Sequence, residues 1–195
     1  GILSFDQASL AVDFRTIILL FSMMIVTANL KLSGFFQLAG DYLLKTVHTK
    51  KALLFAVIMT SGILSAFFIN DIVCLLFTPV VIGICHQSGV KPLPFLLGTA
   101  TASNIGSAGT LIGNPQNILI GSLSHLPFSS YLVSAFPFAL FGLVINYLFI
   151  SRLYRKDLAG ELPSVTPSNG HHHTYYLMTK SLATTILILA GFILG

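Results

Sequence analysis

Apolar stretches separated by short polar or charged segments follow one another along the whole chain. They cover residues 14–30, 52–69, 72–85, 93–123, 131–151 and 177–195. At about 1.5 Å per residue, the first stretch is about 25 Å long as a helix, close to the thickness of a membrane core. The pattern predicts an all-α membrane protein, a bundle of transmembrane helices.

Residues 34–47 show a different pattern. One set of residues is apolar and recurs at helical spacing, namely Phe35, Leu38, Ala39, Tyr42, Leu43 and Val47, while Gln37, Asp41 and Lys45 take the other face. This spacing is typical of an amphipathic helix that lies in the plane of the membrane interface.

The apolar stretch between Lys51 and Lys91 is interrupted by Asn70-Asp71. The second arm, 72–85, is short for a full span but suits a re-entrant element. We therefore predict a re-entrant helical hairpin, 52–85, that enters and leaves the membrane on one side. The alternative is two complete spans with Asn70 and Asp71 at the far surface.

Residues 93–123 are too long for one straight span, and the polar, helix-breaking run SNIGSAGTLIGNPQN occupies 103–117. This predicts a broken helix with an unwound middle. The resulting organisation is a scaffold span plus interfacial helix (1–50), a transport unit (51–151), a cytoplasmic loop (152–176) and the start of a further span (177–195). Because the chain begins with Gly1 and stops inside an apolar helix, we expect a fragment of a longer protein.

Composition supports this class. Of the 195 residues, 54% are hydrophobic and 8% are charged, and the mean hydropathy is +0.88, whereas soluble domains carry about 25% charged residues. The net charge of +4 does not indicate nucleic-acid binding, because Lys and Arg sit in loops between apolar segments. The expected surroundings are a lipid bilayer.

The basic residues also predict topology. With a re-entrant hairpin, nine of the ten fall on one side of the membrane, namely Lys31, Lys45, Lys50, Lys51, Lys91, Arg152, Arg155, Lys156 and Lys180. Arg15 is on the other side. Because cytoplasmic loops are enriched in Lys and Arg, we assign the basic side to the cytoplasm of a multi-pass protein in the plasma membrane, the bacterial inner membrane. Two full spans give the same count.

Each break offers distinct chemistry. Asn114 before Pro115 is a strong helix start, so the following half-helix directs its N–H groups toward the membrane interior. Asn70-Asp71 precedes Ile72 in the same way. The helices that end near Ile69 and 102–105 present carbonyls. Free N–H groups suit an anion, and carbonyls and side-chain oxygens suit Na⁺ or a proton carrier.

These arguments give the candidate site. The residues predicted to bind substrate or ion are Asn70, Asp71, Ser103, Asn104, Gly106, Thr110, Gly113, Asn114 and Asn117, and those with structural roles are Pro79, Gly109 and Pro115. The alternative is that the small residues only pack helices.

Asp71 is the only acidic residue between Lys51 and Lys91. We expect it to be buried and to bind Na⁺ together with Asn70, or to carry a proton. Capping of Ile72 near the surface is the alternative.

No nucleotide loop, Ser-His-Asp set or Cys/His zinc spacing is visible, so we expect neither an enzyme nor a cofactor. The function predicted is secondary active transport of a small ion, an anion by preference, coupled to H⁺ or Na⁺. A non-transporting membrane subunit and a channel are the alternatives. We also expect a homodimer in the full-length protein.

Two segments carry a resemblance to a known group. Ser65–Pro79 (SAFFINDIVCLLFTP) and Ser103–Asn117 resemble the ion transporter superfamily, which includes arsenite permeases, sodium/proton antiporters and citrate and dicarboxylate transporters. The resemblance extends over residues 12–156. It implies two inverted repeats, of which this chain contains the first, and an elevator-like movement of the hairpin domain.

By position, the resemblance places Asn70 and Asp71 at the hairpin tip and 106–117 in the unwound loop that binds ion and substrate. The tip differs from the Ser-Asn-Thr of sodium/dicarboxylate symporters, because this chain has Ile69-Asn70-Asp71, as in the arsenite-permease and antiporter branches. Dicarboxylate specificity and Na⁺ coupling therefore do not follow from the resemblance.

Overall fold

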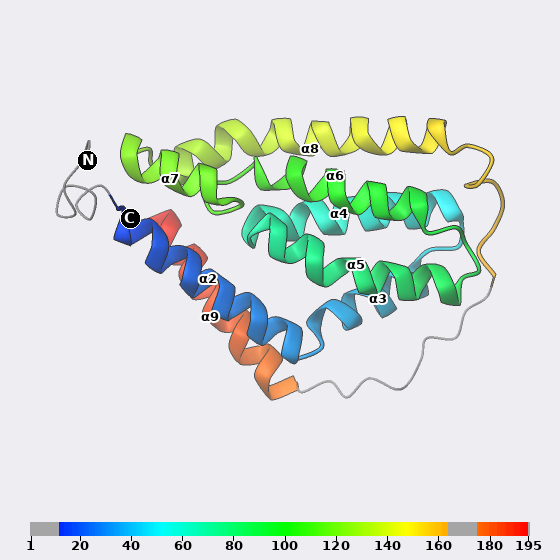
Figure 1. Cartoon of the computed structure of the whole chain (residues 1–195), viewed down its shortest axis with the longest axis horizontal. Helices are drawn as coiled ribbons and strands as arrows, with labels where there is room; N and C mark the ends of the chain where they lie inside the picture. Colours follow the sequence, from blue (N-terminus) through cyan, green and yellow to red (C-terminus); the bar gives the residue numbers. More distant parts are fainter. Residues whose placement is uncertain (1–11, 164–174, 195) are drawn as a thin grey trace, which may run out of the picture.

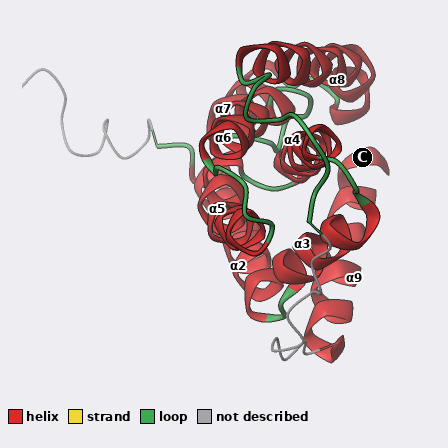
Figure 2. Ribbon diagram, turned by 90° about the vertical axis from the view of Figure 1, so that its right-hand side faces the viewer, coloured by secondary structure: helices red, strands yellow, loops and turns green. Residues whose placement is uncertain are grey.

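A computed structural model of the protein describes residues 12–163 and 175–194. In these residues every helix is an α-helix (Figure 2). The one β-type contact among them is an isolated bridge between Thr49 and Glu161. The predicted all-α fold is confirmed. Helices α4 (Lys50–Phe67), α5 (Asn70–Gln87) and α8 (Phe128–Leu153) are each long and apolar enough to cross a membrane.

Four helices, α4, α5, α6 (Leu93–Ser107) and α8, lie side by side in Figure 1, and α4 packs against the other three. The face of α6 toward α4 carries Gly98, Ala102 and Gly106, spaced by four residues, all of them buried. Small residues at this spacing let two helix backbones approach closely. Gly106 lies against the backbone of Gly62, where a Cβ atom would overlap the Gly62 carbonyl group.

The hairpin consists of α4 and α5, joined at Phe68 and Ile69. Thr49 caps α4, because its side chain accepts a hydrogen bond from the backbone N–H of Ala52 at 3.2 Å. The second arm is longer than predicted: α5 has 18 residues and begins at Asn70. The sequence pattern placed Asn70 in the turn, whereas Ile69 takes the N-cap position.

The hairpin tip does not reach as far as the end of the molecule at which α7 (Pro115–Ser124) lies (Figure 1). Each arm is about 27 Å long, and α8, with 26 residues, is about 39 Å long. This difference favours a re-entrant hairpin over two complete spans, although both arms have the length and composition of a span. The depth of the tip in a membrane stays a prediction.

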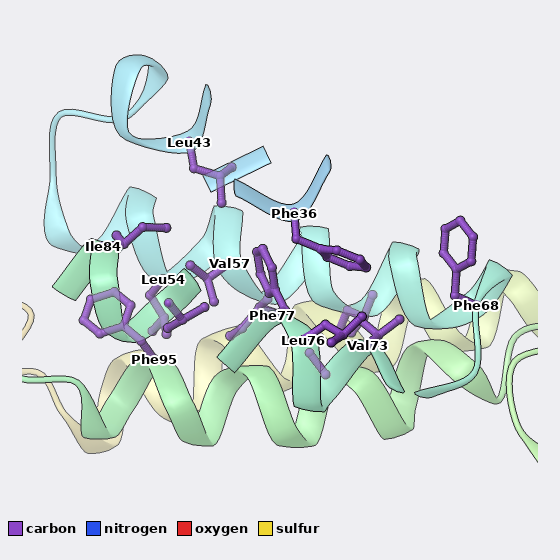
Figure 3. Packing of buried hydrophobic residues seen from close by; sticks show 14 of the residues in the cluster. Phe36, Leu43, Leu54, Val57, Phe68, Val73, Leu76, Phe77, Ile84 and Phe95 are labelled. Carbon is purple, nitrogen blue, oxygen red and sulfur yellow. The ribbon is translucent and has the colours of Figure 1, made fainter. Parts of the chain in front are cut away.

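Helix α3 (Phe35–Thr46) follows α2 (Phe14–Leu32) after a bend of 56°. Gly34 makes the turn with φ 81°, a conformation that favours glycine. The buried residues of α3 are Phe36, Gly40 and Leu43, and Phe36 and Leu43 point toward the hairpin in Figure 3. The face with Phe36 and Gly40 packs on α5, whereas Tyr42, on the predicted apolar face, is 68% exposed. The in-plane orientation stays a prediction.

Helix α9 (Tyr175–Leu194) runs antiparallel to α2, and the two form a tilted pair at one side of the four-helix group (Figure 1). Part of the predicted loop 152–176 and the end of the last predicted span, 195, lie outside the described residues.

Three loops predicted to share the cytoplasmic side meet at one end of the molecule. Lys91 forms a salt bridge with Asp157, with 2.7 Å between Nζ and Oδ1. The backbone N–H of Leu162 donates to the carbonyl of His48 at 2.9 Å. These contacts bring the segment after α8 across the bases of α4 and α6, as the charge pattern requires.

Candidate functional site

The structure brings the two chain breaks together. The backbone N–H of Asn70 at the hairpin tip donates to the carbonyl of Gly113 at 2.9 Å. Its side-chain Nδ2 donates to Oδ1 of Asn104 at 3.1 Å. One residue therefore joins the tip both to the end of α6 and to the loop between α6 and α7.

The start of α7 has the geometry expected from Asn114-Pro115. Oδ1 of Asn114 accepts a hydrogen bond from the backbone N–H of Asn117 at 2.8 Å, and Pro115 occupies the first turn. The cap satisfies one of the donors that a helix start leaves free, and Pro115 has no N–H to satisfy. The predicted broken helix is thus seen as α6, an unwound segment 108–114, and α7.

Side-chain amides bind the unwound segment from within. Nδ2 of Asn117 donates to the carbonyls of Thr110, at 2.9 Å, and Ser107, at 3.3 Å. Nδ2 of Asn114 lies 3.4 Å from the same Ser107 carbonyl and 3.3 Å from the Ser107 hydroxyl. The segment is held in one conformation by amide groups that the sequence assigned to ligand binding.

A second cross-link joins the unwound segment to the hairpin. The hydroxyl of Thr110 donates to the carbonyl of Ala66, in the last turn of α4. The expectation that helix-end carbonyls are free is therefore wrong for Ala66 and Ser107, since donors of the same chain occupy them. The sequence could not reveal this, because Thr110 and Ala66 are 44 positions apart. Each carbonyl oxygen still has a second lone pair.

Glycines allow the tight backbone packing around this point. A Cβ atom on Gly113 would overlap the backbone of Ser107, and one on Gly106 would overlap Gly62. Gly109 lies against α8, where a Cβ atom would be 3.1 Å from that of Ala139. These contacts give all three glycines a packing role, and ligand binding by Gly106 and Gly113 stays a prediction.

Asn70 and Asp71 have opposite environments. Asn70 is 8% exposed, and its Oδ1 atom has no hydrogen-bond partner among the described residues. Asp71 is exposed, so the prediction that it is buried is wrong for this chain. Successive helical residues point about 100° apart, and only one of the pair can face α6. Asp71 lies in the first turn of α5, where a carboxylate interacts favourably with the helix dipole.

The remaining predicted residues are distributed around this point. Ser103 is buried and donates to the carbonyl of Ala100 within its own helix, at 3.1 Å. Pro79 is exposed and lies nine residues after Asn70, about 13 Å farther along α5, so it is separate from the site.

One group near the breaks was missed from sequence. Ser65 is fully buried, and its hydroxyl has no hydrogen-bond partner within the described parts of the chain. It opens the segment Ser65–Pro79 around the hairpin tip, and that position was the available signal. Ser107 lies in the polar run 103–117 that the sequence marks, and its backbone carbonyl accepts hydrogen bonds from two amides.

The chemistry of this region is that of neutral oxygen and amide groups. Within residues 12–163 and 175–194, no group of three or more His, Cys, Asp or Glu side chains could hold a metal ion. A buried amide oxygen without a donor is costly unless a cation, water or donor-bearing solute satisfies it. Among the predicted site residues in the described parts of the chain, Asn70 Oδ1 is the buried acceptor left without a protein donor.

Comparison with known proteins adds family information. The sequence model described as "Citrate transporter" matches residues 1–195. The chain is 36% identical over 159 residues to the silicon efflux transporter LSI3 of Oryza sativa subsp. japonica, which covers 82% of this chain and 33% of that protein. It is 30% identical over 158 residues to the putative transporter arsB of Dictyostelium discoideum, covering 81% of this chain and 28% of that protein.

A third relative is the 46 kDa membrane protein of Mycobacterium leprae, which is 33% identical over 151 residues, or 76% of this chain and 35% of that protein. The chain thus spans about a third of the length of these relatives.

Proposed function

The chain belongs to the citrate transporter family, and on that premise we propose that the complete protein is a secondary active transporter of a small ion, preferably an anion, driven by H⁺ or Na⁺. The family and the transporters among its relatives make it a multi-pass membrane protein and not an enzyme. An anionic substrate is supported by the family's description as citrate transporters.

The observation that carries the proposal is the environment of Asn70. Its backbone and Nδ2 bind the unwound segment and α6, while Oδ1 is buried without a partner. The tip is therefore fixed by two bonds and keeps one acceptor for a ligand. Amide oxygens of this kind are suitable ligands for Na⁺.

Asp71 has a different role in the proposal. Its carboxylate is exposed next to Asn70, on the side of the tip that this chain leaves uncovered. It supplies negative charge beside the Asn70 acceptor, for Na⁺ or for a proton carried with the substrate. We assign the ion site to these two residues together.

The membrane and the oligomeric state belong to the proposal as well. We place the protein in the plasma membrane, the bacterial inner membrane, with the Lys91–Asp157 end in the cytoplasm. The complete protein is proposed to be a homodimer.

The test is flux through the complete protein in proteoliposomes, with citrate and arsenite as probes and with imposed Na⁺ or H⁺ gradients. We expect saturable, gradient-driven flux that Asn70→Ala lowers at least about tenfold, because a buried ligand oxygen is worth about 1.5–3 kcal/mol when it binds a charge. Asn29→Ala is the matched control, since Asn29 is half-buried on α2, away from the hairpin tip, and bonds the Ile25 carbonyl of its own helix.

Three results would contradict the proposal. Flux that does not saturate and ignores the gradients indicates a channel. Equal flux in wild type, Asn70→Ala and Asp71→Asn would show that the hairpin tip does not bind the ion or substrate. Absence of flux for every probe favours a non-transporting subunit.

A further inference from the structure

A polar contact joins α2 to α7 across 109 positions of sequence. Oδ2 of Asp13 accepts hydrogen bonds from the hydroxyl of Ser122 at 2.8 Å and from that of Thr16 at 2.7 Å. The two hydroxyl oxygens are 3.3 Å apart. Because one carboxylate holds hydroxyls from two helices, the contact is specific in distance and in partner.

The contact lies between two groups of helices. On one side, α2 packs along α9. On the other, α7 is attached through Asn114 and Asn117 to the end of α6, and thereby to the hairpin (Figure 1). The described chain passes from the first group to the second at the Gly34 turn, where α2 and α3 bend by 56°.

Packing around the contact is incomplete. A cavity of about 990 Å³ lies beside it, lined by α2, the unwound segment, α7, the start of α8 and α9, and Thr16 and Ser122 both line this cavity. Apolar contact between the two groups is therefore reduced at the place where the polar contact forms. By contrast, α4 and α6 meet with direct backbone contact at Gly62 and Gly106.

Each partner also has a bond within its own helix. The Ser122 hydroxyl lies 3.0 Å from the Leu119 carbonyl. Asp13 accepts from the backbone N–H of Thr16 at 3.3 Å, which caps α2. When α2 and α7 separate, the Asp13 carboxylate and the Ser122 hydroxyl each keep a hydrogen bond next to their own helix. The free-energy cost of breaking the contact is therefore small, and the contact can form again.

We propose that Asp13, Thr16 and Ser122 form a reversible latch, which holds the α2–α9 pair against α7 in the conformation seen and opens when the hairpin group moves relative to that pair. Only the role of the latch in transport rests on the proposed function. Its opening and closing can be measured without a substrate. Ser122 is a positioning residue that need not touch the substrate.

The first test measures distance in the complete protein, with Cys74 and Cys85 replaced by Ala and spin labels at Ile18→Cys on α2 and Phe141→Cys on α8, both exposed. We expect two distances, with Ser122→Ala shifting their ratio about tenfold toward the open one, since it loses a bond to a charged group. Ser124→Ala is the control, because its exposed hydroxyl donates to the Ile120 carbonyl within α7 itself. One common distance in all three proteins would overturn the latch.

The second test closes the latch covalently with Thr16→Cys and Ser122→Cys. The hydroxyl separation of 3.3 Å puts the two sulfur atoms within reach of a disulfide. We expect oxidation to lower citrate or arsenite flux at least about tenfold and reductant to restore it, as expected for a contact that must open in each cycle.

The control pair is Thr101→Cys with Asn146→Cys, which links α6 to α8. Both helices belong to the group that packs around the hairpin, and Thr101 Oγ1 and Asn146 Oδ1 are 3.1 Å apart in the wild type. Oxidation of this pair should leave flux unchanged. Complete cross-linking of 16 to 122 with unchanged flux refutes the latch. If wild type transports neither probe, the proposed function fails, while the distance measurement still decides the latch.

Discussion

The α4–α6 contact and the α2–α7 contact are built in opposite ways. Between α4 and α6, small residues allow the backbones to touch. Near the hairpin tip, Thr110 of the unwound segment bonds Ala66 of α4, and Asn70 of α5 bonds Asn104 of α6. Between α2 and α7, a carboxylate and two hydroxyls meet beside a large cavity. Dense packing makes the hairpin and broken helix one rigid group, and a polar contact with little apolar support is the place where such a group can separate from its neighbour.

The largest effect should come from Gly106→Ala. Its Cβ atom would overlap the Gly62 backbone, which cannot move aside as a flexible side chain could. We expect a loss of about 3 kcal/mol or more, seen as a lower midpoint of thermal unfolding by far-UV circular dichroism in detergent. Gly83→Ala is the control, because a Cβ atom there would meet nothing within 4 Å. Equal midpoints would show that the α4–α6 contact is not tightly packed.

Truncation of leucine on each side compares the two contacts directly. Leu54→Ala empties a site in α4 that is 0% exposed, and we expect a cost of about 2–3 kcal/mol from lost packing. Leu19→Ala, in α2 and already lining the cavity, should cost about 1 kcal/mol or less. The same unfolding assay measures both, and a larger effect at Leu19 would reverse the interpretation of the two contacts.

Thr110→Val tests the cross-link between the unwound segment and the hairpin. The valine keeps the shape and loses the bond to the Ala66 carbonyl, so we expect a cost of about 1 kcal/mol, typical of hydrogen bonds between helices in membranes. Hydrogen exchange should increase near Ala66 and Thr110. Thr184→Val is the control, since Thr184 is exposed and its hydroxyl donates to the Lys180 carbonyl within α9. Unchanged exchange would mean that the bond does not hold the segment.

Much of the fold could be predicted from local sequence. The break after Ser107, the start of α7 at Pro115 and the turn before Phe35 each depend on Gly, Asn or Pro, whose conformational preferences act over a few residues. The predicted start of α5, at residue 72, differs from the observed start at Asn70. Hydropathy cannot distinguish Asn70 as the first residue of a helix from Asn70 as part of a turn.

The candidate site was predicted less completely for a physical reason. The sequence marked Asn70 and Asp71 alike, and only packing against α6 decided that Asn70 faces inward and Asp71 outward. The latch gave no sequence signal, since Asp13 and Ser122 are 109 residues apart and each is an ordinary polar residue at a helix end or face.

By itself, the sequence determined that this chain forms apolar helices with two breaks, since hydrophobic length and helix-breaking residues act locally. Only the tertiary structure decided how the polar groups at those breaks are used. Asn114, Asn117 and Thr110 bind carbonyls of their own chain, and Asn70 keeps an acceptor without a partner in the described chain. Hydrogen-bond partners depend on which helices lie together, and that is set by packing over the whole molecule.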